Sequence, residues 1–150
     1  MNLKSLHLNK HRRQVGFTMV EILLVLAVVA VLTAISVPVY TQHVVKANRT
    51  ALKSEMTLIA QKLANYKMVN HNYNITLATL NGSIVYPSQG DTLYDLELDT
   101  ATVAGAWTLT AAPRTGSKQM GDGVVRLNDQ GWQCWTKTAI ACTLSSASKW

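Results

Sequence analysis

Glu21 is a lone carboxylate at the start of a long apolar run, and its position suggests a task beyond packing. The run covers Ile22–Gln42, twenty-one residues without an Asp, Glu, Lys or Arg. As an α-helix it is about 31 Å long at ~1.5 Å per residue, enough to cross a hydrocarbon core of ~30 Å. A carboxylate carried into that core costs roughly 2.5–3.5 kcal/mol on insertion scales. We therefore expect Glu21 to have a partner, supplied by another copy of the chain.

Three other interpretations of this region remain open. Glu21 could be an interfacial acid that reaches toward water and stays unpaired, since it lies only one position before the run. The run itself could be a plain single-pass anchor for an unrelated domain, or an ordinary secretory signal with a small-residue cleavage site at Ala34-Ile35-Ser36. An ordinary signal does not usually carry an acid between its basic and apolar regions, which argues against the last interpretation.

Basic residues are concentrated before the apolar run. The chain has a formal net charge of +6, and four of its fourteen Lys and Arg residues precede Gly16. In the remainder of the chain, basic and acidic residues nearly balance. The basic excess is therefore better explained as a membrane-topology signal than as a nucleic-acid-binding surface. Positive charge beside an apolar helix stays in the cytoplasm, so we expect the N-terminus inside and Lys46 onward outside.

An amphipathic pattern continues directly from the apolar run. Its apolar stripe has helical spacing and consists of Val45, Leu52, Met56, Ile59, Leu63 and Tyr66. Arg49 and Lys53 are among the charged residues placed off this stripe. The pattern predicts one helix from about Thr18 to about Asn70. Pro38 lies inside it and is expected to kink the helix or leave it easily unwound.

The C-terminal half of the chain is predicted to form a small sheet. Ala106–Ala112 alternates apolar and polar residues, and Val124–Leu127 and Trp132–Thr136 flank a turn at residues 128–131. Ile84–Tyr86 and Leu93–Leu98 are either short strands or coil, and a glycine-bearing loop spans residues 113–123. These signals predict an α+β fold, in which the apolar stripe of the helix covers one face of an antiparallel meander.

The two cysteines, Cys134 and Cys142, both lie in the part expected outside the cytoplasm. An even number, close spacing and an exported compartment suggest a disulfide between them. Two free buried thiols are the alternative.

The sequence carries no recognisable catalytic pattern, so we expect no enzyme activity, no cofactor and no metal. Asp122 and Asp129 flank the predicted hairpin and are weak candidates for calcium ligands. A second weak candidate is a DNA-contacting patch of aromatic and basic residues near the C-terminus. Its members are Trp132, Trp135, Lys137, Lys149 and Trp150. The alternative is that the tryptophans fill a sheet core and the lysines keep its rim soluble.

The N-terminal residues resemble the class III signal of type IV pilins and their pseudopilin relatives. The resemblance rests on Gly16-Phe17-Thr18-Met19-Val20-Glu21 and the apolar helix that follows, with Pro38 and Tyr40 placed as in that family. Residues 107–113, 123–128 and 131–132 are similar to minor pilins of the type IV pilus. Two departures occur. Met19-Val20 stands where Leu-Ile is commonest, and a cysteine often found near the position of Val124 is missing, which leaves the first disulfide partner open.

This resemblance implies a pilin fold and a sequence of events at named residues. A prepilin peptidase cuts after Gly16 and methylates the new amine of Phe17. In a filament, Glu21 pairs with the Phe17 amine of a neighbouring subunit while the apolar helices form the core. Pro38 lets that helix stretch or melt locally under axial load. The resemblance also implies a disulfide loop at the C-terminus, for which Cys134 and Cys142 are the available residues.

The expected organisation therefore has three parts. Residues 1–16 are a cleaved leader, residues 17–45 a transmembrane and assembly segment, and residues 46–150 a periplasmic globular domain. The chain is expected in the inner membrane and then in an extracellular filament. Its expected partners are other pilin subunits, the prepilin peptidase and the inner-membrane assembly machinery.

The resemblance implies a structural subunit, a minor rather than a major pilin. Its expected roles are pilus biogenesis, twitching motility, adhesion or DNA uptake. The alternatives are a type II secretion pseudopilin and a DNA-binding receptor for natural transformation.

Overall fold

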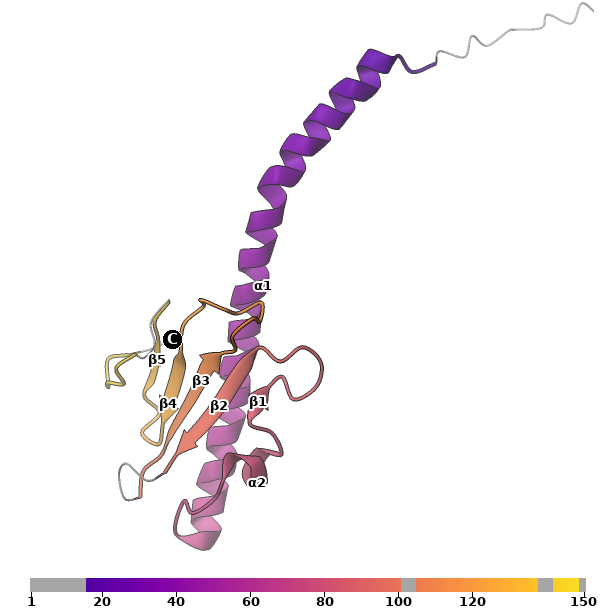
Figure 1. Ribbon diagram of the computed structural model, residues 1–150. Coiled ribbons are helices and arrows are strands. Elements are labelled where there is room, and N and C mark those ends of the chain that lie inside the picture. Colours follow the sequence, from indigo (N-terminus) through magenta and orange to yellow (C-terminus); the bar gives the residue numbers. More distant parts are fainter. Residues whose placement is uncertain (1–15, 101–104, 138–141, 149–150) are drawn as a thin grey trace, which may run out of the picture. The chain divides into compact units, whose positions relative to one another are not determined.

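The computed structural model describes residues 16–100, 105–137 and 142–148 (Figure 1). The chain divides into two compact units, Met1–Tyr40 and Thr41–Trp150. Most of the predicted leader lies outside the described residues, as do Lys149 and Trp150 of the predicted C-terminal patch. The helix α1, Met19–Asn70, contributes to both units. Its bounds confirm the helix predicted from the apolar run and the stripe.

The start of α1 follows from its residue types. The Thr18 hydroxyl accepts a hydrogen bond from the backbone N–H of Glu21 at 3.2 Å, which is the arrangement of a helix N-cap. Glu21 lies in the first turn, where the helix dipole favours a negative charge. The cap and the acid together explain why the helix begins at Met19 rather than earlier.

The first unit presents its side chains outward. Every described residue from Gly16 to Tyr40 is exposed, although the segment is almost wholly apolar. The hydroxyls of Thr33 and Ser36 bond back to carbonyl oxygens of Val29 and Leu32, at 3.0 and 2.8 Å. The helix can therefore satisfy its own polar groups without water, as a membrane-spanning helix must. The segment is long and apolar enough to cross a membrane.

α1 is helical on both sides of Pro38. The kink expected at this proline stays a prediction.

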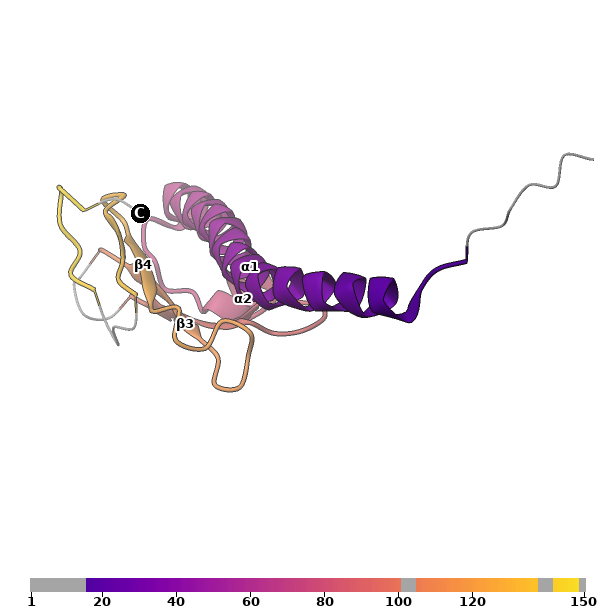
Figure 2. The same cartoon turned by 90° about the horizontal axis from the view of Figure 1, so that it is seen from above.

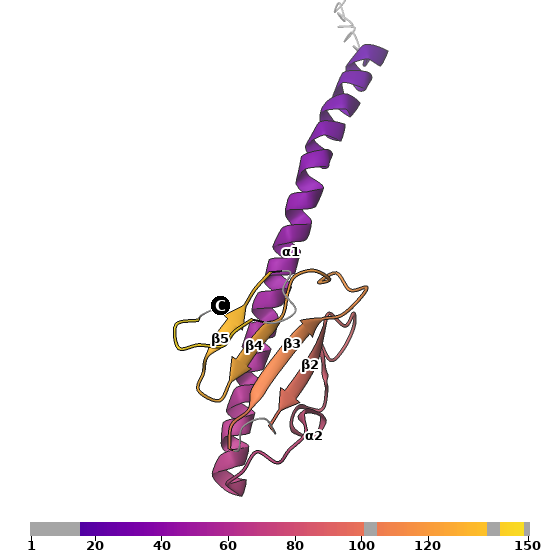
Figure 3. The same ribbon diagram turned by 60° about the vertical axis from the view of Figure 1, so that its left-hand side comes forward.

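The second unit contains a five-stranded antiparallel sheet. Its strands are β1 (Val85–Tyr86), β2 (Tyr94–Asp99), β3 (Thr108–Pro113), β4 (Val125–Asn128) and β5 (Gln133–Trp135). Their spatial order is the same as their order in the chain, and each neighbouring pair is antiparallel. Figure 3 shows β2 to β5 side by side across the C-terminal half of α1. The predicted meander is confirmed.

The core lies between that half of α1 and one face of the sheet. Leu52, Met56, Ile59 and Leu63 of the predicted stripe have no exposed surface. They pack with inward-facing strand residues, which alternate with exposed or half-buried ones, and with Trp107 just before β3. The strand residues include Leu96, Leu109, Ala111, Val125 and Leu127. Figure 2, which looks down on the molecule, shows β3 and β4 lying beside the helix.

A short helix, α2 (Leu77–Asn81), was not expected from the sequence. The Thr76 hydroxyl caps its N-terminus by accepting from the N–H of Thr79, and Gly82 in a left-handed conformation ends it. Leu77 turns into the core with 5% of its surface exposed. Five residues are too few to show a helical period, which is why the sequence pattern does not reveal this element.

Candidate functional site

The segment expected to be processed lies just before α1. Phe17 is 74% exposed, and a side-chain carbon placed on Gly16 would meet nothing within 4 Å. The chain itself therefore does not require a glycine at this position. A requirement for a small residue there has to come from a protein that acts on the segment, as the family resemblance implies.

Glu21 is exposed in the first turn of α1. In the described part of the single chain it takes part in no ion pair. Its backbone N–H is held by the Thr18 side chain, so the position of the helix start is defined within this chain. Its pairing with the amine of a neighbour stays a prediction.

Cys134 and Cys142 form a disulfide, with an S–S distance of 2.06 Å and Cα atoms 5.9 Å apart. The predicted pairing, rather than two free thiols, is what the structure contains. Both residues are buried, and the Arg126 guanidinium donates to the carbonyl oxygen of Cys142 at 3.2 Å. The segment from Cys142 onward is thus held against β4 and β5 by a covalent link and a charged hydrogen bond.

A buried polar cluster centres on Asp122, in the connection between β3 and β4. One carboxylate oxygen forms an ion pair with Arg49 of α1. The other accepts from the Tyr94 hydroxyl of β2 at 2.9 Å. Asp122 is 5% exposed, and the side chain of Arg49 is 13% exposed. Burying a carboxylate is costly unless it is paired and hydrogen-bonded, and these contacts supply both.

Gln119 completes the cluster and has no exposed surface. Its amide nitrogen donates to the Tyr94 oxygen at 2.6 Å and to the backbone carbonyl of Val45 at 3.2 Å. Its amide oxygen accepts from the Asn48 side chain at 3.1 Å. The side chains of Gln119 and Asp122 therefore fasten the β3–β4 connection to the α1 segment from Val45 to Arg49.

Trp135 of β5 closes the cluster on one side. Its indole N–H donates to the carbonyl oxygen of Asp122 at 2.9 Å, and the Arg49 guanidinium lies 3.7 Å from the ring centroid. The Lys53 ammonium lies 5.9 Å from the same ring. Both contacts have the geometry of a cation–π interaction.

Gly123 lets the chain pass close to the end of β5. Its φ is +93°, and a Cβ atom there would lie 2.0 Å from the carbonyl oxygen of Thr136. No other residue type fits this position without displacing backbone, so the glycine brings Asp122 and Trp135 together.

Burial in this cluster changes two pKa values. Burial raises the pKa of Tyr94 well above its usual range, and the hydrogen bond to Asp122 raises it further. Burial also lowers the pKa of Lys53, with the charge of Arg49 as the next cause.

The cluster corrects two expectations. Arg49 was placed off the apolar stripe, yet it lies inward, because positions 45, 49, 52 and 56 continue one helical face. A basic residue on that face was the available signal for a buried acid partner. Asp122, a weak calcium candidate, instead pairs with Arg49, while Asp129 is exposed in the β4–β5 turn. No group of metal-binding side chains occurs in the part of the chain that the structure describes.

The predicted aromatic and basic patch is only partly assembled. Trp135 stacks against Arg49 and donates a hydrogen bond to Asp122, and Trp132 is half-buried. Lys137 is exposed. The remaining two members lie outside the described residues.

Comparison with known proteins gives curated relatives over part of the chain. Type II secretion system core protein G of Pseudomonas aeruginosa is 32% identical over 79 residues, which is 53% of this chain and 56% of that protein. The protein of the same name from Escherichia coli K12 is 30% identical over 76 residues, 51% of this chain and 52% of that protein. The chain thus spans about half the length of the curated relatives it matches.

One solved structure is also similar. The non-core minor pilin PilV of Neisseria meningitidis aligns with a TM-score of 0.48 and 17% identity, over 67% of this chain and 94% of that one.

Two family profiles match adjoining parts of the chain. The prokaryotic N-terminal methylation motif matches residues 11–37, which include Gly16, Phe17 and Glu21. The family described as type IV minor pilin ComP, DNA uptake sequence receptor, matches residues 38–134. That match covers more than half of the 150 residues and nearly all of the sheet. The chain belongs to the type IV minor pilin family.

Proposed function

We propose that this minor pilin is stored in the inner membrane by the apolar half of α1 and polymerises through the same half. The observation that carries this proposal is the exposure of every described residue from Gly16 to Tyr40. An apolar helix of this length is left uncovered by the residues that the structure describes, so it needs either lipid or the helices of other subunits. Storage and assembly use the same surface, because helices can replace lipid around one another.

Maturation is proposed to create the charge that assembly requires. Cleavage between Gly16 and Phe17 by a prepilin peptidase exposes an amine, which the same enzyme methylates. The amine stands less than two helical turns before Glu21. A staggered neighbour then offers its Phe17 amine to Glu21 at the depth where an unpaired carboxylate is costly. The match of residues 11–37 to the N-terminal methylation motif supports this step.

The proposed organisation follows from the same argument. Residues 1–16 are the cytoplasmic leader, residues 17–45 the membrane and assembly segment, and residues 46–150 the periplasmic domain that becomes exposed on the filament. The basic residues before Gly16 support this orientation. The other expected partner is the inner-membrane assembly machinery.

Mass spectrometry of purified filaments tests the proposal directly. We expect the chain in sheared pili at a low ratio to a more abundant subunit, with a mature N-terminus at methylated Phe17. A chain that starts at Met1 and stays in the envelope would contradict it. Recovery only with a type II secretion complex would favour the pseudopilin alternative, which is consistent with the partial match to core protein G.

A second candidate function is DNA binding during uptake. It is favoured by one observation, the match of residues 38–134 to a family described as a DNA uptake sequence receptor. Binding of duplex DNA to the full chain should weaken as salt increases, because phosphate contacts release counterions. The variant Lys137→Ala with Lys149→Ala should bind less strongly if the C-terminal patch contributes. Unchanged binding in that variant would exclude the patch as the contact surface.

A further inference from the structure

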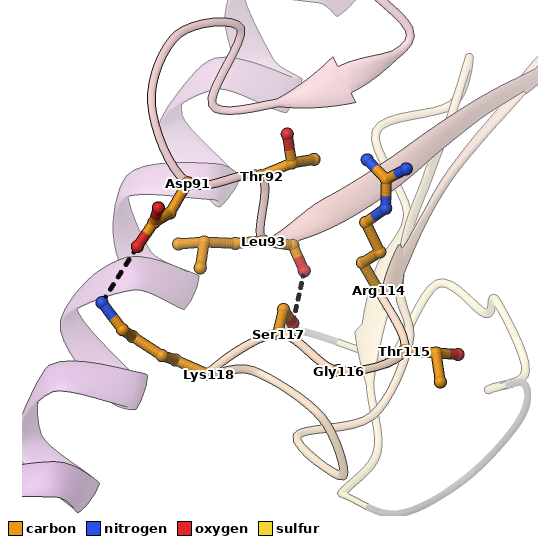
Figure 4. Close-up of a pocket in the computed structure, with 8 residues that line it drawn as sticks. All are labelled: Asp91, Thr92, Leu93, Arg114, Thr115, Gly116, Ser117 and Lys118. Atoms are coloured by element: carbon orange, nitrogen blue, oxygen red, sulfur yellow. Dashed lines mark hydrogen bonds and ion pairs between the residues drawn. The ribbon is translucent and has the colours of Figure 1, made fainter.

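A groove in the second unit has a composition that suits an anion. It has a volume of about 390 Å³ and lies between the β1–β2 and β3–β4 connections. Its lining residues are Asp91, Thr92, Leu93, Arg114, Thr115, Gly116, Ser117 and Lys118. Figure 4 shows the two connections facing each other, with Lys118 reaching across to Asp91. The volume falls within the range of ordinary ligand pockets, ~300–1,000 Å³.

Residues 114–118 form the donor-rich wall of this groove. The five consecutive residues supply a guanidinium, two hydroxyls and an ammonium, with Gly116 at the centre. Gly116 has a φ of +80°, a left-handed backbone conformation that favours glycine. Within the described residues, the backbone N–H groups of Thr115 and Gly116 have no hydrogen-bond acceptor.

The wall is held in place by bonds that use the Ser117 hydroxyl but leave the backbone N–H groups of Thr115 and Gly116 available. The Leu93 carbonyl oxygen accepts from the backbone N–H of Arg114 at 2.9 Å and from the Ser117 hydroxyl at 3.1 Å. The turn itself is closed by the Ser117 N–H, which donates to the Arg114 carbonyl at 3.1 Å. The loop is therefore anchored at both ends while its centre faces the groove.

Two acids lie beside the basic groups, and their geometry decides how available those groups are. Lys118 pairs with Asp91 at 3.0 Å, but both side chains are mostly exposed, at 72% and 80%. Arg114 stands 3.9 Å from Asp95, beyond hydrogen-bonding distance, and both are about half exposed. Exposed ion pairs contribute little, so the two cations can turn toward an anion that offers several acceptors at once.

We propose that this groove binds a phosphate group. A phosphate presents several acceptor oxygens, and the loop offers two backbone N–H groups, of Thr115 and Gly116, that are unpaired within the described residues, together with the charged side chains of Arg114 and Lys118. Arg114 supplies a planar guanidinium suited to two phosphate oxygens, and Lys118 supplies a second charge. The phosphate comes either from a small phosphorylated compound or from the backbone of a nucleic acid. The proposal does not depend on the assembly function proposed above.

The test uses the full chain in detergent micelles, with inorganic phosphate as the probe and backbone amide resonances as the readout. We expect saturable shifts of the Thr115 and Gly116 amides with phosphate and none with chloride at equal ionic strength. Arg114→Gln should weaken binding about tenfold, because it removes a charged bidentate donor. Lys46→Gln, which removes an exposed charge on α1, is the matched control and should bind as the unaltered chain does.

A gain-of-binding variant makes the test sharper. Asp91→Asn removes the acid that competes for Lys118, so phosphate affinity should rise several-fold. Non-saturable shifts, or equal affinity in Arg114→Gln and the unaltered chain, would overturn the proposal. A duplex oligonucleotide that shifts the same amides and is displaced by phosphate identifies nucleic acid as the source. Shifts with phosphate alone identify a small compound.

Discussion

Arg49 and Asp122 form an ion pair although 73 positions separate them in the chain. The pair joins α1 to the β3–β4 connection, and Trp135, Tyr94 and Gln119 surround it. It lies at the end of the stripe nearest the apolar run, before Leu52, the first of the buried residues of α1. A polar cluster thus holds the beginning of the globular domain's helix in place of hydrophobic packing.

Replacing Asp122 should destabilise the second unit more than replacing any exposed acid. Asp122→Asn keeps the shape but leaves the Arg49 charge, which is only 13% exposed, without its counter-ion. Breaking a buried pair in this way costs roughly 3–5 kcal/mol, and the partial exposure of Arg49 places our expectation near about 3 kcal/mol. Chemical unfolding of a fragment from Thr41 onward measures it.

Asp129→Asn is the matched control for that experiment, since Asp129 is exposed in the β4–β5 turn. It should change the free energy of unfolding by less than about 0.5 kcal/mol. Equal stability of the two variants would show that the Arg49–Asp122 pair contributes little.

Alkaline pH should lower the stability of the same fragment through Tyr94. The pKa of Tyr94 is raised in the folded state, so above about pH 10 the unfolded chain loses this proton while the folded chain keeps it. Stability then falls as pH rises, by at most about 1.4 kcal/mol per pH unit for this one group. Unfolding measured from pH 8 to 11 should show a shallower decline in Tyr94→Phe. Parallel declines in the two proteins would contradict the assignment.

Reduction of the Cys134–Cys142 link should lower the stability of the domain. The link closes a short loop, with a sequence separation of 8, which corresponds to about 2.5 kcal/mol in the chain-entropy account. Thermal melting with and without reductant gives the difference. The double variant Cys134→Ser with Cys142→Ser should melt at the same temperature as the reduced protein, whether or not reductant is present. A reductant effect that persists in this variant would refute the explanation.

Gly16→Leu should block maturation. A side chain at this position meets nothing in the chain itself, so the effect would arise at the peptidase and not from misfolding. A slower-migrating precursor on a gel of membrane fractions is the expected result. Met19→Leu, a conservative change within the same segment, should be processed normally. Normal processing of Gly16→Leu would move the cleavage site elsewhere.

Glu21→Ala should leave the chain in the membrane but remove it from sheared filaments. The variant makes the helix more apolar, so insertion is not impaired, while the proposed partner of the Phe17 amine is lost. Immunoblots of the membrane and filament fractions separate the two effects. Glu97→Ala, which removes an exposed acid of β2, serves as the control and should incorporate normally. Incorporation of Glu21→Ala at the unaltered level would count against the pairing.

The sequence alone determined the parts of this protein that depend on local pattern. The helical spacing of apolar residues from Leu52 to Leu63 and the alternation of apolar and polar residues around Leu109 predict which faces of the helix and strand are buried. The structure buries those faces. The spacing and number of the cysteines suggested a disulfide between Cys134 and Cys142, with free thiols as the alternative, and the structure contains the disulfide. Helix bounds and strand order followed because each is set by residues within one segment and its turns.

The tertiary structure decided what depends on residues far apart in the chain. No periodicity relates Arg49 to Asp122. Position 49 lies on the helical face of the stripe, but its charged side chain was expected on the solvent side, and only the fold shows the buried acid that it pairs with. The groove between Asp91 and Lys118 likewise exists only because antiparallel pairing of β2 with β3 brings two connections to the same edge. Such contacts depend on the topology of the fold, since a charged side chain can be buried only where the fold places a partner of opposite charge beside it.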